Sequence, residues 1–240
     1  MAAAVEAELL RDPGFVAKAS QAMGEGREPR CERRCLLVLG PSAAGKSKLI
    51  SDGRLVRNCP EGALVLDGGY IREVSASWAQ AASLAKSVGL VGFSDYFERY
   101  FKPPMDKVKE QIVSDALARG ANLIVPETAS SLRSATRTVD RIVAAGYSVT
   151  LAAVYADRAT CEARGAERTD KKYSSKNWEA SVQAIIDVHA HLRCTAPSAL
   201  AGAPQLFCNT GEPHAVPEGR LAELLAAHRV QAAAARPQSR

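Results

Sequence analysis

The sequence predicts an α/β fold of the phosphate-loop, nucleotide-kinase type, a three-layer sandwich on a mainly five-stranded parallel sheet. Two observations predict it. The motif GPSAAGKS at residues 40–47 directly follows an apolar run at residues 35–39, and strand, loop and helix in this order are what a phosphate loop requires. Further along, short apolar runs alternate with stretches of helical periodicity, which is typical of parallel strands joined by helices.

The residue types of the motif suit phosphate binding. Gly40 and Gly45 let the backbone curl so that amide N–H groups point at phosphate oxygens. Lys46 would reach the β- and γ-phosphates, and the Ser47 hydroxyl would coordinate Mg²⁺. A helix expected over residues 46–56 would direct its positive N-terminal end at the same anion. A chance match in an ordinary glycine-containing loop is the alternative. The residues expected to bind ATP are Gly40, Pro41, Ser42, Ala43, Ala44, Gly45, Lys46 and Ser47.

Further strands are expected at residues 63–66, 122–125, 147–155 and 205–209. The second ends at Asp67 and the third at Glu127 and Thr128, so these side chains should meet at the edge of the sheet where α/β proteins bind ligands. Helices are expected over residues 70–86, from Pro103 to Gly120, over residues 132–145 and from Trp178 onward. For the aromatic residues within 93–101, local packing is favoured over contact with a substrate.

Basic residues crowd together after the fourth strand. Arg158, Arg164, Arg168, Lys171, Lys172 and Lys176 fall within nineteen residues. On charge alone a solvated helix face would be the ordinary interpretation. In phosphate-loop kinases, however, a mobile arginine-bearing lid occupies this position and stabilises the charge of the transferring group. A lid is therefore the favoured interpretation.

Composition limits the other functions. The 240 residues suit one α/β domain, and the net charge of +5 without a basic stripe gives little support for nucleic-acid binding. No apolar run approaches a membrane span, and the N-terminus lacks the order of a secretory signal, so a cytoplasmic protein is expected. The six cysteines lack CxxC pairs, which favours reduced thiols over zinc. The expected division is a helical appendage and linker at residues 1–34, the kinase-like domain at 35–230 and a tail at 231–240.

From residue 35 to about residue 192 the chain resembles the zeta-toxin family of small kinases. The resemblance rests on the ordered set of the phosphate loop, the strand end at Asp67 with Arg72 beyond, residues 122–127 (NLIVPE), the junction at residues 141–150 and the basic stretch ending at residues 177–179. Bacterial members phosphorylate the 3′-hydroxyl of UDP-N-acetylglucosamine with ATP. The resemblance implies the same fold, with Arg164 and Arg168 contacting the transferred phosphate and Glu127 and Thr128 on the acceptor side.

Two departures from the family pattern concern the acceptor site. The family pattern after the second strand is D-x-D-x-[FY]-[KR], whereas this chain has Asp67 followed by Gly68 and Gly69. Either Asp67 is the base that takes the proton of the acceptor hydroxyl, or it only orients Mg²⁺ through water. The family's E-G-T segment reads Glu127-Thr128-Ala129 here, which keeps the acid but changes the residues expected to touch a sugar nucleotide.

The function expected from these features is an ATP- and Mg²⁺-dependent phosphotransferase acting on a hydroxyl of a small molecule, such as a UDP-amino sugar, with Lys46, Asp67, Arg164 and Arg168 as its catalytic residues. Two alternatives stay open: another phosphate-loop kinase for small molecules, and an ATP-binding protein without catalysis whose role is to bind a partner. A motor or nucleic-acid NTPase is disfavoured, because no apolar run ending in Asp-Glu is present.

Overall fold

The sheet that organises the molecule has six strands. The computed structural model describes residues 2–55, 59–90, 96–167, 173–217 and 219–234. The strand order is β2-β3-β1-β4-β5-β6, in which the first five are parallel and β6 runs antiparallel to β5. The strands are β1 (Arg34–Leu39), β2 (Leu64–Val65), β3 (Leu123–Glu127), β4 (Ser148–Tyr155), β5 (Gln205–Cys208) and β6 (His214–Val216). The predicted parallel strands are thus confirmed. Strand β6 was not predicted, because its residues show no alternation of apolar and polar side chains.

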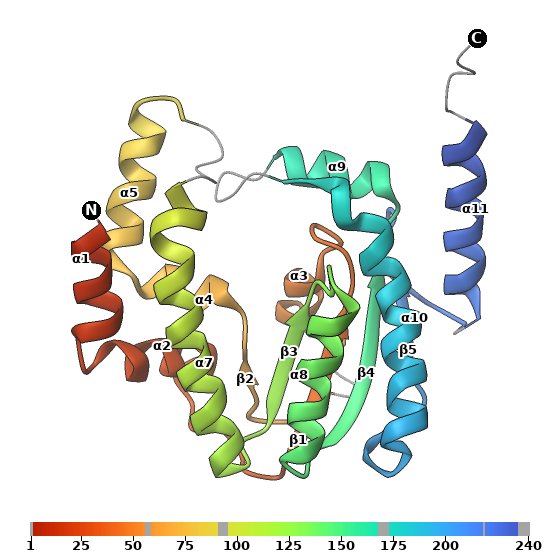
Figure 1. Cartoon of the computed structure of the whole chain (residues 1–240), viewed down its shortest axis with the longest axis horizontal. Helices are drawn as coiled ribbons and strands as arrows, with labels where there is room; N and C mark the ends of the chain where they lie inside the picture. Colours follow the sequence, from red (N-terminus) through yellow and green to blue (C-terminus); the bar gives the residue numbers. More distant parts are fainter. Residues whose placement is uncertain (1, 56–58, 91–95, 168–172, 218, 235–240) are drawn as a thin grey trace.

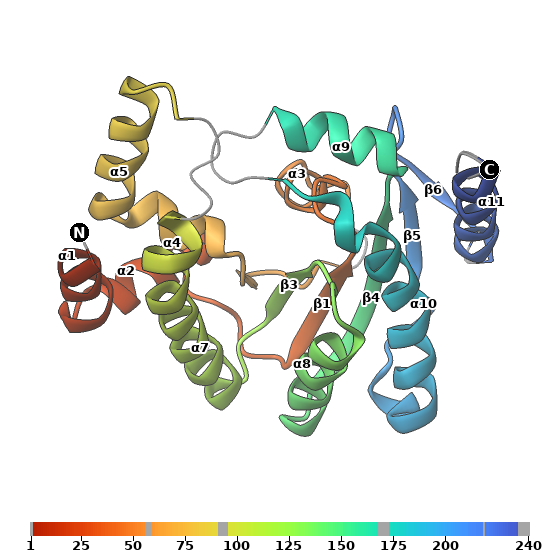
Figure 2. The ribbon, with the colours of Figure 1, turned by 45° about the horizontal axis from the view of Figure 1, so that its top comes forward.

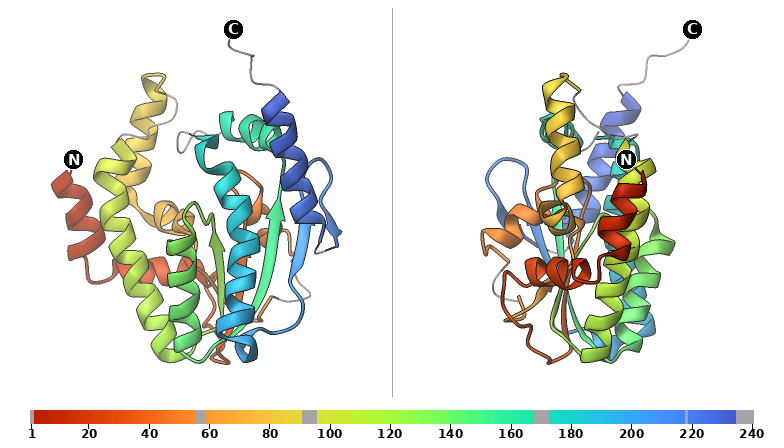
Figure 3. Two further views of the ribbon diagram at one scale, coloured as in Figure 1. Left: turned by 45° about the vertical axis from the view of Figure 1, so that its right-hand side comes forward. Right: turned by 90° about the vertical axis from the view of Figure 1, so that its left-hand side faces the viewer.

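Helices cover both faces of the sheet, as the three-layer prediction requires. In Figures 1 and 3, α7, α8 and α10 lie on one face, α3 lies on the other, and α11 stands beyond the β5–β6 edge. The α-helices of the described chain are α1 (Ala2–Glu6), α2 (Phe15–Met23), α3 (Lys46–Ser51), α4 (Gly68–Val74), α5 (Ala76–Ser87), α7 (Lys102–Arg119), α8 (Leu132–Ala144), α9 (Arg158–Ala166), α10 (Trp178–Thr195) and α11 (Arg220–Ala234). Shorter helical turns are η1 (Ala7–Arg11), η3 (Phe97–Phe101), η4 (Ser175–Asn177) and η5 (Pro197–Ala199).

Two expected helices differ from the structure. Helix α3 stops at Ser51 rather than continuing toward residue 56, because the chain turns at Asp52 and Gly53, whose φ of 65° is left-handed. The single helix expected over residues 70–86 is two helices, α4 and α5. They are separated by Ser75 in extended conformation, whose hydroxyl accepts the Trp78 N–H at 3.1 Å and caps α5.

The N-terminal helices pack on the body of the molecule. Val5, Leu9 and Met23 are buried in the same apolar core as the sheet. Glu8 accepts hydrogen bonds from the backbone N–H groups of Ala76 and Ser77 at the start of α5. Figure 3 shows α1 and α2 beside α7. Residues 2–23 therefore support the wall formed by α4, α5 and α7.

The aromatic residues around η3 serve mainly in packing. Phe101 is fully buried, and the rings of Phe97 and Phe101 meet Trp78 edge-to-face at 5.5 and 5.1 Å. Phe97 also lines the cleft described below, and Phe93 lies outside the described residues. None of the described helices has the length and apolar character needed to cross a bilayer.

Candidate phosphate-binding and catalytic site

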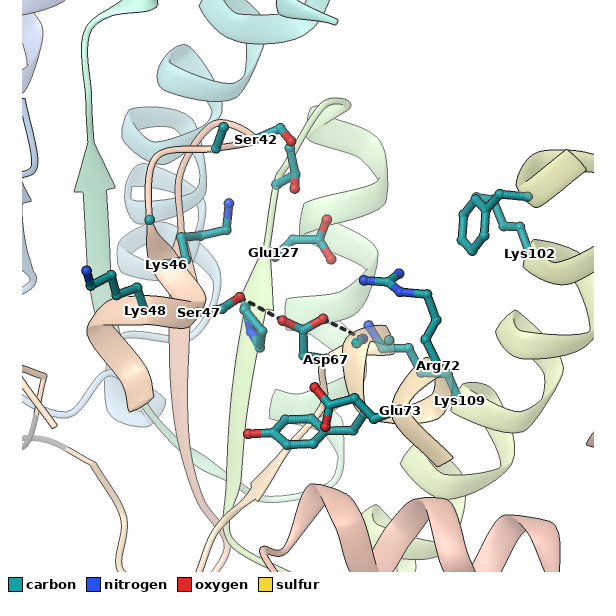
Figure 4. A pocket seen from close by; sticks show the side chains of 18 of the residues that line it. Ser42, Lys46, Ser47, Lys48, Asp67, Arg72, Glu73, Lys102, Lys109 and Glu127 are labelled. Atoms are coloured by element: carbon teal, nitrogen blue, oxygen red, sulfur yellow. Dashed lines mark hydrogen bonds between the residues drawn. The ribbon is translucent and has the colours of Figure 1, made fainter. Parts of the chain in front are cut away.

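The candidate site is a cleft at the carboxyl ends of β1, β2 and β3. Parallel strands bring their carboxyl ends to one edge of the sheet, and the order places β1 between β3 and β4, where ligands of open α/β sheets bind. The cleft has a volume of about 870 Å³. Ser42, Lys46, Asp67, Glu127 and Arg164 all contribute to its lining, so the structure brings together residues that are far apart in the sequence (Figure 4).

Lys46 is held by the loop that it belongs to. Its ammonium group donates to the carbonyl oxygens of Gly40 at 2.7 Å and Pro41 at 2.9 Å, and the residue is only 9% exposed. A buried lysine needs such partners because an uncompensated charge is costly away from water. The charge therefore already lies inside the loop, where phosphate oxygens would be cradled.

Gly40 and Gly45 are required by close approaches. A Cβ on Gly40 would lie 2.2 Å from the Val154 carbonyl oxygen, and one on Gly45 would lie 2.3 Å from the Asn209 side-chain nitrogen. Gly45 also has a left-handed φ of 92°. The Asn209 amide donates to the Ala44 carbonyl oxygen at 2.6 Å, and Asn209 is 6% exposed. The loop is thus clamped between β4 and the end of β5.

Ser47 and Asp67 form the oxygen pair of the site. The Ser47 hydroxyl donates to Oδ2 of Asp67 at 2.8 Å, and the Gly69 N–H donates to Oδ1 at 2.9 Å. Burial raises the pKa of Asp67. These two hydrogen bonds and the nearby charges of Lys109 and Arg72 together lower it by more, so the pKa lies below its usual value. Asp67 is consequently a carboxylate at neutral pH. A hydroxyl beside a carboxylate is a donor set that fits Mg²⁺.

Glu127 stands at the end of β3, next to the start of the loop. Its backbone pairs with Leu39, its carbonyl oxygen accepts the Gly40 N–H at 3.3 Å, and its side chain accepts the Ala129 N–H at 3.2 Å. Thr128 follows it in the cleft wall. In Figure 4 the Glu127 carboxylate lies between Lys46 and the helix that carries Lys109. It therefore lies between the phosphate loop and the opposite wall.

Arg164 reaches the loop from α9. Its Nη1 lies 3.9 Å from the position that a Cβ on Gly45 would occupy. This nitrogen is buried, and no described residue accepts a hydrogen bond from it. Arg158, in contrast, pairs with Glu162 at 3.0 Å on the exposed side of the helix. Arg168 lies outside the described residues, as do Lys171 and Lys172, so of the two predicted lid arginines only Arg164 has a described place.

The wall opposite the loop is rich in charge. Arg72 from α4 and Lys102 and Lys109 from α7 line the cleft there, together with Glu73, Glu98 and Asp106. The Arg72 guanidinium lies over the rings of Trp78 and Phe97, at 5.8 and 5.7 Å. This wall can therefore offer both cations and carboxylates to a molecule bound in the cleft.

Sequence reasoning missed several contributors, among them Asn209, Lys102 and Lys109. Asn209 gave no signal, because its partner is 165 residues away. Lys102 and Lys109 gave only a weak one, being exposed-looking lysines on an amphipathic helix. Within the described part of the chain, no three His, Cys, Asp or Glu side chains are grouped to hold a metal ion.

Fold and cleft together define a phosphate-loop protein of kinase type. The chain belongs to the zeta toxin family, whose model matches residues 21–199, well over half of the chain. Comparison with curated protein sequences gives no match.

Solved structures support the same fold. One from the PezAT chromosomal toxin–antitoxin system of the human pathogen Streptococcus pneumoniae has a TM-score of 0.60 at 17% identity, covering 90% of this chain and 86% of that one. The AvrRxo1-ORF1:-ORF2 structure with ATP has a TM-score of 0.57 at 15% identity, covering 92% and 70%. The same complex with sulphate ions has a TM-score of 0.54 at 16% identity, covering 88% and 65%.

Proposed function

We propose that this protein is an ATP- and Mg²⁺-dependent phosphotransferase that phosphorylates a hydroxyl of a small molecule. The observation that carries the proposal is the buried Nη1 of Arg164, which lies against the phosphate loop without a hydrogen-bond acceptor among the described residues. A buried guanidinium nitrogen left in this way is costly unless an acceptor such as an anion completes its surroundings. The γ-phosphate of ATP in the loop would be that anion, and the ATP of a related structure supports this ligand.

The residues then divide the work between holding phosphate and handling the acceptor. Lys46 and the loop amides would hold the β- and γ-phosphates, while Arg164 would neutralise charge on the transferring group. Ser47 and Asp67 would hold Mg²⁺, which supplies charge neutralisation between the phosphates. The hydrogen bond between these two side chains favours the metal-organising role of Asp67 over that of base.

Glu127 and Thr128 would contact the acceptor hydroxyl. Glu127 suits this task because its backbone pairs with Leu39, beside the loop, and the residue also lines the cleft in which the acceptor would bind. Arg168 remains a second proposed arginine of the lid. The acceptor proposed from the family is a UDP-amino sugar. Another small-molecule acceptor is the alternative that the changed residues at 69 and 129 favour. A cytoplasmic location is part of the proposal.

The test is release of ADP, with the mass of the product, from Mg²⁺-ATP and a panel of UDP-sugars, nucleosides and sugars. Lys46→Ala should reduce turnover by at least about a hundredfold, because it removes the charge on the transferring phosphate. Lys107→Ala is the matched control, since Lys107 is exposed on α7 and does not line the cleft. ATP turnover by the Lys46→Ala variant at the wild-type rate would overturn the proposal.

One observation favours a second candidate function. Position 69 is a glycine where the family pattern has an acid, so catalysis lacks one carboxylate. An ATP-binding protein that presents a surface to a partner would fit this loss. Related structures come from the PezAT toxin–antitoxin system and from AvrRxo1-ORF1:-ORF2. ATP binding that depends on Lys46, without phosphorylation of any acceptor in the panel, would favour this function.

A further inference from the structure

A second cavity opens from the cleft and runs between α7 and α8. It has a volume of about 520 Å³, and Figure 2 shows β3 in the interval between the two helices. Asp106, Lys109 and Glu127 line both the cleft and this groove. Glu127 therefore stands at the junction, with the phosphate loop on one side and the groove on the other.

Aliphatic side chains from β3 and from both helices contribute to the lining of the groove. Leu123 and Val125 of β3 form its floor, because alternate residues of a strand point to the same face. Val113, Leu117 and Ile142 come from the helices on either side. Val113 and Leu117 are only half-buried, so the native fold leaves this apolar surface incompletely covered. Charged side chains from the two helices, Asp106, Lys109, Glu110, Arg137 and Arg141, line the groove as well.

An ion pair joins the two walls. Arg141 of α8 pairs with Glu110 of α7 at 2.7 Å, and its other terminal nitrogen donates to the Ser114 hydroxyl at 2.9 Å. Glu110 and Arg141 both line the groove from opposite helices. This ion pair therefore joins α7 to α8 across the groove, while Asp106, Lys109 and Glu127 connect the groove to the cleft.

We propose that this groove binds the apolar part of the acceptor, so that the acceptor is an amphipathic alcohol carrying an alkyl or acyl chain. The inference rests on the proposed function, since it places the acceptor hydroxyl at Glu127 and extends the same molecule away from the loop. A nucleobase is a poorer occupant, because Leu123 and Val125 offer it no hydrogen bond and the wall residues Glu110 and Arg141 are already paired with each other. Burial of an alkyl chain against the half-buried Val113 and Leu117 needs no such partners.

The test uses n-alkyl β-D-glucopyranosides from methyl to octyl, below their micelle concentrations, with binding measured by calorimetry in the absence of ATP. Each added methylene should tighten binding about two- to fourfold while the chain fills the groove. Wild-type affinity that does not change with chain length would overturn the proposal.

Substitutions in the groove test where the alkyl chain of the glucoside binds. Val113→Trp and Thr138→Trp fill the groove from opposite walls and should each abolish the dependence on chain length, with folding checked by thermal melting. Ile186→Trp is the matched control, because it fills a different apolar groove between α10 and the start of α11. Loss of the dependence in Ile186→Trp, with its retention in both groove variants, would place the chain elsewhere and refute the inference.

The two proposals fail separately. Lys46→Ala removes phosphate binding but leaves the groove intact, so it should keep the dependence on chain length. A protein that phosphorylates an acceptor and shows no such dependence would retain the proposed function and lose the groove. A protein that binds glucosides with longer alkyl chains more tightly but never uses ATP would support the groove proposal and contradict the proposed function.

Discussion

Arg164 is the residue of the site for which a bound anion would matter most. Its Nη1 is buried beside Gly45 without an acceptor among the described residues. Arg164→Ala should lower kcat by about a thousandfold, because the arginine would stabilise charge that develops during transfer, and it should also weaken ATP binding, because the same Nη1 would contact the γ-phosphate of bound ATP. Steady-state kinetics against Arg193→Ala, an exposed arginine on α10, provide the comparison. Equal effects of the two substitutions would show that Arg164 has no part in transfer.

Gly69 offers the opposite kind of test, a gain. A Cβ there would lie 3.4 Å from Oδ1 of Asp67 and 3.8 Å from a terminal nitrogen of Arg72, which is ordinary contact. Gly69→Asp should therefore be tolerated and should raise turnover on the order of tenfold, if the reaction lacks a base. Gly68→Asp adds the same charge one residue earlier, where a Cβ has open space around it, and should not raise turnover. An unchanged rate in both variants would show that another group already takes the proton.

At the scale of elements, α5 is held by a carboxylate from a distant helical turn. Glu8 accepts hydrogen bonds from Ala76, Ser77 and Ser75. Burial raises the pKa of Glu8. The hydrogen bonds from Ser77, Ala76 and Ser75 together lower it by more, so the pKa lies below its ordinary value of 4.5. A depressed carboxyl pKa stabilises the fold above the unfolded-state value, and this contribution disappears as the pH falls through the folded-state pKa.

Glu8→Gln should thus destabilise the protein by about 1 kcal/mol at neutral pH, as loss of a helix cap does. The melting temperature should fall by about 2–4 °C. The difference from wild type should shrink in acid, where Glu8 is protonated in both states. Calorimetry at neutral and acid pH measures it, with the exposed Glu6→Gln as the control. A difference that stays constant across pH would assign the effect to packing instead of charge.

For the whole molecule, the clamp between β5 and the phosphate loop links stability to binding. Asn209→Ala removes the amide that donates to the Ala44 carbonyl and leaves a buried acceptor unsatisfied. The expected cost is about 1–3 kcal/mol of folding free energy, together with weaker ATP binding. Asn209→Asp keeps the size but not the donor and should do the same. Thermal melting and ATP titration would contradict this expectation if both variants matched wild type.

Local chemistry explains which parts of this fold the sequence could predict. The phosphate loop, the strands around it and helix α7, which ends at Gly120 with a φ of 71°, follow from patterns of neighbouring residues. The split at Ser75 was missed: its cap on the Trp78 N–H is local, but Ser75 also donates to the Glu8 carboxylate, which lies 67 residues away in the sequence. The short strand β6 has three residues with no buried side chain, so it shows no alternation to detect.

In the site, the same rule separates what was foreseen from what was not. Lys46, Ser47 and Asp67 are set by motif and strand end, whereas Asn209 and the groove between α7 and α8 depend on how distant segments pack. Helical periodicity indicates which face of α7 is apolar, but it does not show how far α8 stands from it. Long-range packing is the part that pattern reasoning on one sequence could not supply.

The clamp at Asn209 also bears on how the protein is made. Synthesis proceeds from the N-terminus, so residues 40–47 leave the ribosome long before their support on β5 does. A nascent chain, or one that terminates before residue 209, contains the whole nucleotide motif without the amide that fixes Ala44. If the loop binds a nucleotide as proposed, this order would delay completion of the site until residue 209 has been translated, and products truncated before it would carry an incomplete site.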